Sequence, residues 1–106
     1  MDVWEINDID PSGSVARYVE FQRSKDLSSG VYTIPKGARD PQRPHGEDEI
    51  YYVVRGKGKL EIEGKLREVR EGSVVFVPAG AHHRFMDVTA DLVLLVVFGP
   101  AEHSRP

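Results

Sequence analysis

The chain has 106 residues, a formal net charge of −3, and 40% hydrophobic and 29% charged residues, which is typical of one globular domain with one core. It contains no Cys, which excludes a disulfide framework, a thiolate metal site and a thiol nucleophile. The small acidic excess argues against nucleic-acid binding, and the longest apolar run, residues 92–98, is too short for a membrane helix, which needs about 20 residues. The first residues show no targeting signal, so we expect a cytoplasmic protein.

Short apolar or alternating segments separated by Gly and Pro predict strands along most of the chain. Residues 1–16 are expected to form an N-terminal arm or an edge strand, and residues 102–106 a frayed tail. Alternation is clearest where Leu60 and Ile62 share one face and charged residues take the other. Strands are predicted at residues 17–21, 30–34, 50–54, 59–63, 65–70, 74–77 and 92–98.

These segments predict an all-β domain of about eight or nine strands, because none shows sustained helical periodicity. Two sheets paired in a jelly roll, or one sheet closed into a barrel, would protect the strand edges. Either arrangement has a mouth where polar side chains can converge on a ligand.

The first group of possible metal ligands lies in residues 44–49. On one extended strand, His45 and Glu49 would be about 13 Å apart, which is too far to share an ion. A turn at Gly46 that leads into a strand would bring them together, and so would one helical turn, although Pro44 and the β-forming run that follows disfavour a helix. Imidazole and carboxylate groups are good ligands for Zn²⁺, Fe²⁺, Mn²⁺ and Ni²⁺.

The second group follows the apolar segment that ends at Pro78. Pro at the second position and Gly at the fourth favour a type I turn over residues 77–80. The next strand then begins near His82 and His83, which point to opposite faces, and the spacing alone does not say which of them faces inward. A lone strand histidine is more often structural than a ligand, so it is the combination of imidazoles and a carboxylate that indicates a metal site.

Both groups resemble the motifs of the cupin family. The first cupin motif contains Gly, five residues, His-x-His, three or four residues, Glu, six residues and Gly. This chain keeps that spacing with Gly37, Arg43, His45, Glu49 and Gly56.

The second cupin motif contains Gly, five residues, Pro-x-Gly, two residues, His, three residues and Asn. This chain matches it with Gly72, Pro78, Gly80, His83 and Asp87. The resemblance implies a single-domain cupin jelly-roll barrel, or double-stranded β-helix, over residues 1–106.

The resemblance also implies a set of metal ligands. His83 takes the position of the motif histidine, so His82 should face outward. Together with His45 and Glu49, His83 would hold one divalent transition metal ion per chain, with Fe, Mn, Ni and Zn as the candidates.

Arg43 stands where the family usually has its first metal-binding histidine. It either points outward or binds an anionic group of the substrate, such as a carboxylate or phosphate. Asp40 and Gln42 are the nearby groups that can replace the lost ligand, and no spacing argument selects either.

Strand alternation extends this site. If Glu49 faces inward, Tyr51 does too, and on the other strand Phe85 and Asp87 follow the motif histidine. A largely apolar pocket of this kind suits a small organic ligand. We therefore take Arg43, Tyr51 and Phe85 as the candidate substrate-binding residues, although simple core packing also accounts for Tyr51 and Phe85.

Two functions fit these features. The first is a small metalloenzyme, of oxygenase (such as dioxygenase), isomerase or decarboxylase type, that acts on a small oxygenated organic compound. The alternative is a non-catalytic barrel that binds a small molecule with a structural metal or none. No residue is assigned a catalytic role. Resemblance to small cupins, together with the outward apolar face at Tyr52, also implies a homodimer.

Overall fold

The computed structural model describes residues 1–9 and 13–104. The described residues form one short helix, α1, and six strands. The bounds are α1 (Ile6–Ile9), β1 (Arg17–Arg23), β2 (Ser28–Ile34), β3 (Asp48–Ile62), β4 (Lys65–Arg70), β5 (Val74–Val77) and β6 (His83–Gly99).

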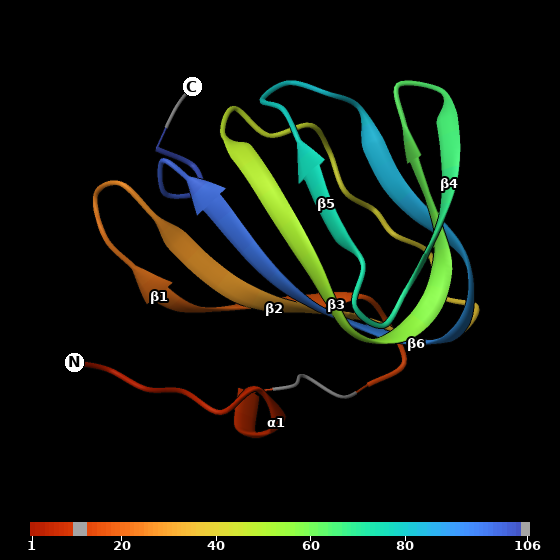
Figure 1. Ribbon diagram of the computed structural model, residues 1–106, viewed down its shortest axis with the longest axis horizontal. Helices are drawn as coiled ribbons and strands as arrows, with labels where there is room; N and C mark the ends of the chain where they lie inside the picture. Colours follow the sequence, from red (N-terminus) through yellow and green to blue (C-terminus); the bar gives the residue numbers. More distant parts are fainter. Residues whose placement is uncertain (10–12, 105–106) are drawn as a thin grey trace.

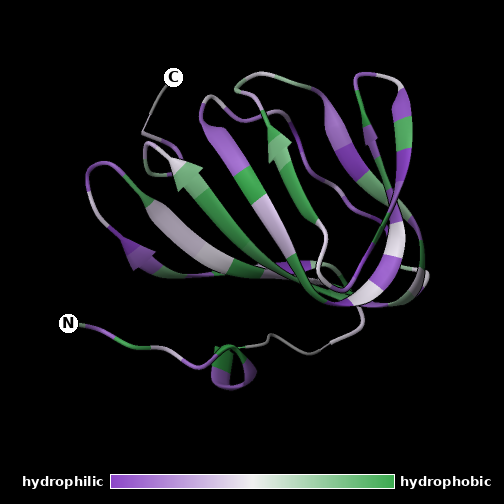
Figure 2. Ribbon diagram, in the orientation of Figure 1, coloured by the Kyte–Doolittle hydropathy of each residue, from purple (hydrophilic) through white to green (hydrophobic). Residues whose placement is uncertain are grey.

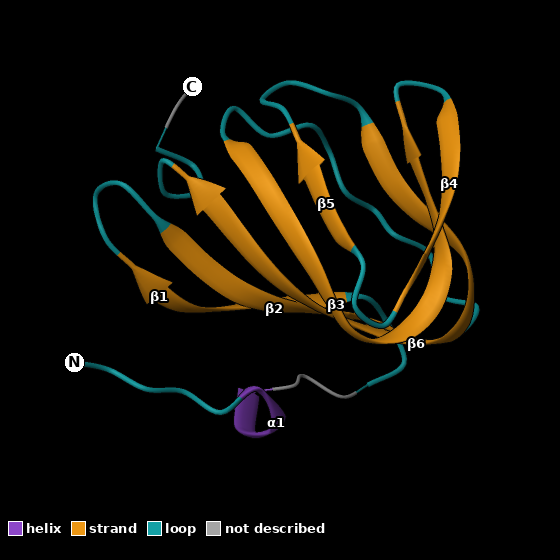
Figure 3. Ribbon diagram, viewed as in Figure 1, coloured by secondary structure: helices purple, strands orange, loops and turns teal. Residues whose placement is uncertain are grey.

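The strands lie side by side in a strongly curved antiparallel sheet (Figures 1 and 3). Their order is β1-β2-β6-β3-β4. β5 pairs with the first half of β3, on the edge opposite β6. This architecture confirms the predicted all-β jelly-roll barrel.

Two strands are much longer than expected. β3 pairs with β6 from Asp48 opposite Gly99 to Ile62 opposite His83, and the register shifts several times between residues 53 and 59. Bulges of this kind bend a strand without ending it. The prediction of about eight or nine short strands is therefore wrong, because β3 and β6 each continue through the bend into the second wall of the barrel.

Alternation along β3 sets the face that is buried. Tyr51 and Val53 are fully buried, whereas Ile50 and Tyr52 are 44% and 41% exposed. β2 is buried at every position, and residues 92–98 of β6 are buried or nearly so, as a strand covered on both faces requires. Figure 2 shows that β5 and the C-terminal half of β6 are mostly apolar.

The N-terminal residues run along the outside of the sheet (Figure 1). Trp4 packs against Phe21 with ring centroids 5.0 Å apart, and Arg55 donates a hydrogen bond to Asn7. Residues 1–9 and 13–16 contain no strand; residues 10–12 of the predicted arm and 105–106 of the predicted tail lie outside the described residues. In the described ranges, no helix has the length and apolar character needed to cross a membrane.

Candidate metal centre

Two hydrogen bonds fasten the two predicted ligand segments to each other at one end of the barrel. The amide of Gly80 donates to the carbonyl of His45 at 2.7 Å. The amide of Ala79 donates to Oδ1 of Asp48 at 2.9 Å. The pairing of β5 with the start of β3 continues this connection into the sheet. Segments more than 30 residues apart in sequence are thereby held at a fixed distance.

The turn between β5 and β6 lies one residue later than predicted. The amide of Ala81 donates to the carbonyl of Pro78, so the turn spans residues 78–81. Gly80 then occupies the third position with φ of +80°, which type II turns require and which glycine adopts without steric cost. The predicted type I turn over 77–80 is wrong because the amide of Gly80, which would close it, donates to the carbonyl of His45 instead.

The structure brings together the three side chains that the cupin resemblance implies. One ligand atom each from His45, Glu49 and His83 lies within 4.8 Å of the others. Nε2 of His83 is 3.2 Å from Oε1 of Glu49, and both side chains are 1% exposed. The ring of His45 packs edge-on against Phe98. His82 is exposed and points away, as expected.

The orientation of His83 fixes which ring nitrogen faces the cluster. Its Nδ1 lies 2.9 Å from the carbonyl of Ala81, so Nδ1 carries a proton that it donates there. Nε2 then faces Glu49. Burial lowers the pKa of His83, but the close carboxylate of Glu49, the Ala81 carbonyl and the charge of Asp40 together raise it above its ordinary value. A backbone carbonyl that orients a histidine in this way is typical of metal ligands.

Glu49 is a buried carboxylate that faces Nε2 of His83 at 3.2 Å but accepts no hydrogen bond of good geometry. Among the described residues, none donates a hydrogen bond to either of its oxygens, although both atoms are inaccessible to solvent. Removing an ionised carboxylate from water without a partner is very costly, so such groups are normally paired or bound to a metal. The two imidazoles beside it and a span of 4.8 Å fit a divalent cation shared by all three side chains after small side-chain movements.

The hydroxyl of Tyr51 lies between Gln42 and the cluster. It donates to Oε1 of Gln42 at 2.7 Å and lies 3.1 Å from Nε2 of His83. Burial, followed by the charge of Glu49, raises the pKa of Tyr51 well above its ordinary value, so the phenol stays protonated. Its ring packs edge-on against Phe85. Tyr51 therefore packs beside His83 and also lines the adjacent cavity.

Asp40 and Gln42 do not replace the missing histidine. The two oxygens of Asp40 accept hydrogen bonds from the Tyr32 hydroxyl, the Phe85 amide, and the amide and side chain of Gln42. The Gln42 side-chain oxygen is taken by Tyr51. Asp40 is thus a structural anchor that holds the loop before β3, and neither residue joins the ligand cluster in the described part of the chain.

The remaining predicted residues lie around this centre rather than in it. Arg43 is exposed and does not line the cavity beside the cluster, while Phe85 is buried behind Tyr51. The expectation that Asp87 faces inward is wrong: its side chain is 65% exposed. Its φ of +48° interrupts the extended backbone, so the alternation that begins at His83 is lost there.

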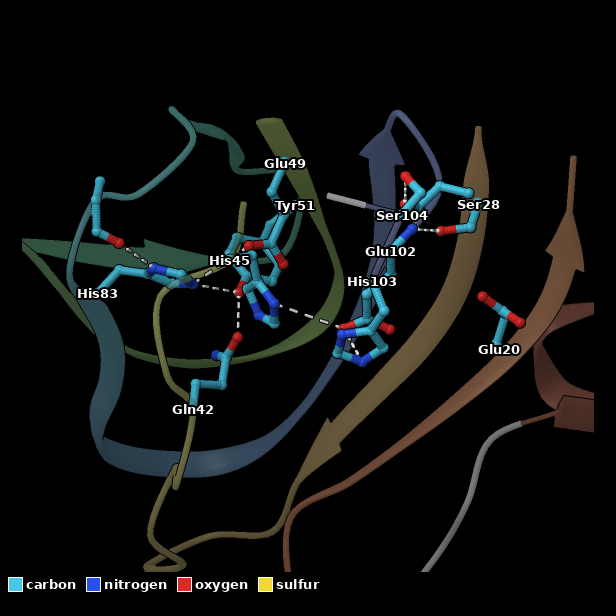
Figure 4. Close-up of polar contacts among 12 residues, drawn as sticks. Glu20, Ser28, Gln42, His45, Glu49, Tyr51, His83, Glu102, His103 and Ser104 are labelled. Atoms are coloured by element: carbon cyan, nitrogen blue, oxygen red, sulfur yellow. Dashed lines mark hydrogen bonds and ion pairs between the residues drawn. The ribbon is translucent and has the colours of Figure 1, made fainter. Parts of the chain in front are cut away.

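A cavity of about 250 Å³ lies beside the cluster. His45, Glu49 and Tyr51 line it, and Tyr18 from β1 and Glu102 from the segment after β6 complete it. Figure 4 shows His45 between Glu49 and Glu102. The cavity therefore connects the cluster to residues from both ends of the chain.

Glu102 was not expected to belong to the site, because it lies in the predicted frayed tail. In the structure its amide donates to Oγ of Ser28 at 2.8 Å, its carbonyl accepts from Arg23 at 2.6 Å, and Oε2 is 3.6 Å from Nδ1 of His45. Burial raises its pKa, against the opposing charges of His103 and His45. No spacing or motif marks Glu102 in the sequence; only the folded strands bring it to the cavity.

The model for the family described as "Cupin domain" matches residues 30–98. The match spans the ligand cluster and most of the sheet. This chain belongs to the cupin family. An uncharacterised Streptomyces coelicolor protein is 42% identical over 85 residues, covering 80% of this chain and 81% of that protein.

Two further comparisons place this cupin among more distant proteins. A Klebsiella pneumoniae protein with a double-stranded β-helix domain superposes with a TM-score of 0.81 over 94% of this chain and 90% of its own, at 13% identity, which shows the shared fold. Acireductone dioxygenase 1 of Vitis vinifera is 33% identical over 57 residues, which is 49% of this chain and 30% of that enzyme. The latter similarity thus covers less than a third of the enzyme.

Proposed function

We propose that this cupin binds one divalent transition metal ion through His45, Glu49 and His83. The observation that carries the proposal is the buried carboxylate of Glu49, whose oxygens receive no hydrogen bond from the described residues while two imidazoles face it. A cation would neutralise this charge and accept the three ligands together. Fe, Mn, Ni and Zn all suit two imidazoles and one carboxylate.

We infer further that the protein is a small metalloenzyme of oxygenase, isomerase or decarboxylase type, with a small oxygenated organic compound as substrate. A metal ion held by only three protein groups supplies a Lewis acid or redox centre with positions open to water or substrate. The chain's own residues orient His83 through the Ala81 carbonyl, pack Tyr51 beside it, and exclude bulk water from Glu49. The similarity to acireductone dioxygenase makes oxygenation the first reaction to test.

A thermal-melting screen of chelator-treated protein with Fe²⁺, Mn²⁺, Ni²⁺ and Zn²⁺ tests metal binding. A metal at a hundredfold excess over its dissociation constant stabilises the folded state by about 2.7 kcal/mol, which raises the melting temperature of a domain of this size by on the order of 10 °C. Oxygen uptake by the best metal form with candidate diketones and phenols then tests oxygenase activity. If none of the four metals shifts the melting temperature, the metalloenzyme proposal is wrong and the non-catalytic binding barrel is favoured.

We also propose that the protein forms a homodimer through the outer face of β3 and β5. Ile50 pairs with Phe76 and Tyr52 with Val74 across the strands, and these four apolar side chains are 41–67% exposed. A second copy would cover this patch. Light scattering should give twice the chain mass for the wild type and one chain mass for Phe76→Lys; a monomeric wild type would contradict the proposal.

A further inference from the structure

We propose that Tyr18 and Glu102 recognise one hydroxyl group of a small, uncharged ligand held in the cavity beside the metal cluster. This inference rests on the proposed function, because it gives the chemical class of the compound that the metal centre would act on. It is carried by two polar groups that are not among the three proposed ligands, although Glu102 also faces Nδ1 of His45.

The first group is the hydroxyl of Tyr18. Tyr18 lines the cavity, and its hydroxyl oxygen is inaccessible to solvent yet has no hydrogen-bond partner among the described residues. The ring reaches this position because it crosses Gly30, where an added Cβ would lie 2.3 Å from it. Edge-on contacts with Tyr32 and Phe98 hold the ring in place. A buried hydroxyl without a partner costs free energy, so a group that enters the cavity and pairs with it after a small movement of the side chain gains affinity.

The second group is the carboxylate of Glu102. Its backbone is held at both ends of the residue by Ser28 and Arg23, and its side chain is 13% exposed. Because a carboxylate only accepts hydrogen bonds, it selects a ligand group that donates. Glu102 also raises the pKa of Tyr18 through its charge, after the larger effect of burial, which keeps the Tyr18 phenol protonated and able to donate.

A hydroxyl group matches both residues in hydrogen-bonding character. It can accept a hydrogen bond from Tyr18 and donate its own proton to Glu102, whereas a carboxylate or phosphate dianion has no proton to donate and would be repelled by Glu102. In the metal-free protein the charge of the cavity agrees with this choice: the described residues that line it include Glu49 and Glu102 but no Lys or Arg. Arg43, which the sequence offered for an anionic substrate, is exposed outside it.

A matched pair of probes tests the proposal: benzyl alcohol and benzoate, which share a ring and differ in the hydroxyl and carboxylate ends. NMR titration of the metal-free wild type measures the dissociation constants of both probes, and we expect benzyl alcohol to bind at least about tenfold more tightly than benzoate. A Zn²⁺ titration is the separate readout for the metal centre. Tyr18→Phe should weaken benzyl alcohol by about fivefold to tenfold, with Zn²⁺ affinity unchanged. Glu102→Gln should reduce the preference for the alcohol, because the amide no longer repels benzoate.

Two variants serve as matched controls. Tyr52→Phe removes a tyrosine hydroxyl from the outer face, and Glu68→Gln removes an exposed carboxylate of β4 that does not line the cavity. Both should bind the two probes as the wild type does. Equal binding of both probes, binding of neither, or wild-type preference in Tyr18→Phe and Glu102→Gln would overturn the proposal. Failure to bind Zn²⁺ would instead overturn the proposed function and leave the alcohol preference intact.

Discussion

The two sides of the cavity are built by different parts of the chain. On the metal side, Glu49 and Tyr51 follow strand alternation in β3, and His83 opens β6 at the spacing of a known motif. On the other side, Tyr18 and Glu102 come from β1 and from the segment after β6, 84 residues apart, and share no pattern. Local periodicity thus explains a site built within neighbouring strands, whereas a site built by joining the chain's ends depends on tertiary structure.

The largest expected effect lies on the metal side. His83→Ala should lower Zn²⁺ affinity by more than about a hundredfold. The variant loses a metal ligand, which costs more affinity than losing a residue that positions a ligand. His82→Ala is the matched control: the neighbouring residue is exposed and should bind Zn²⁺ as the wild type does. Isothermal titration of both variants measures the difference. Similar losses in the two variants would show that His83 has no special role.

A smaller loss is expected for Tyr51→Phe. The variant keeps the ring but leaves Oε1 of Gln42 without its donor and removes the contact with His83. Zn²⁺ affinity should fall by about tenfold, and the free energy of unfolding by about 1–2 kcal/mol. Tyr52→Phe, on the outer face of the same strand, should leave Zn²⁺ affinity unchanged. Urea denaturation and titration together test this, and wild-type values for Tyr51→Phe would contradict the support assigned to its hydroxyl.

Gly30→Ala acts on the opposite side. The new methyl group would overlap the ring of Tyr18, so the ring must move and about 1–3 kcal/mol of stability should be lost. Benzyl alcohol binding should weaken while Zn²⁺ affinity stays within about twofold of wild type. Gly13→Ala, which meets no atom within 4 Å, is the control. Unchanged stability and probe binding would mean that Tyr18 does not depend on the space above Gly30.

The smallest effect is expected at Arg43. Its exposed position outside the cavity predicts that Arg43→Ala changes Zn²⁺ affinity by less than about twofold and stability by less than about 0.5 kcal/mol. A large loss of metal affinity, measured by the same titration, would show that Arg43 contributes to the site after all.

These residues also show where sequence reasoning succeeds and where it ends. Alternation correctly placed Tyr51 inside and Tyr52 outside, because one face of β3 packs on the core. It failed at Asp87, where a positive φ interrupts the strand. It also counted too many strands, because bulges bend β3 and β6 without ending them. Glu102 was not recognisable as a site residue, since the contacts that hold it, with Ser28 and Arg23, span more than 70 residues.

Elemental analysis of the protein purified without chelator, alongside its Glu49→Gln variant, tests the central claim most directly. We expect about one transition metal ion per chain in the wild type and almost none in the variant. The neutral amide of glutamine is a weaker ligand than a carboxylate and does not balance the charge of a divalent cation. Metal-free wild-type protein that also takes up no added Fe²⁺, Mn²⁺, Ni²⁺ or Zn²⁺ would contradict the claim.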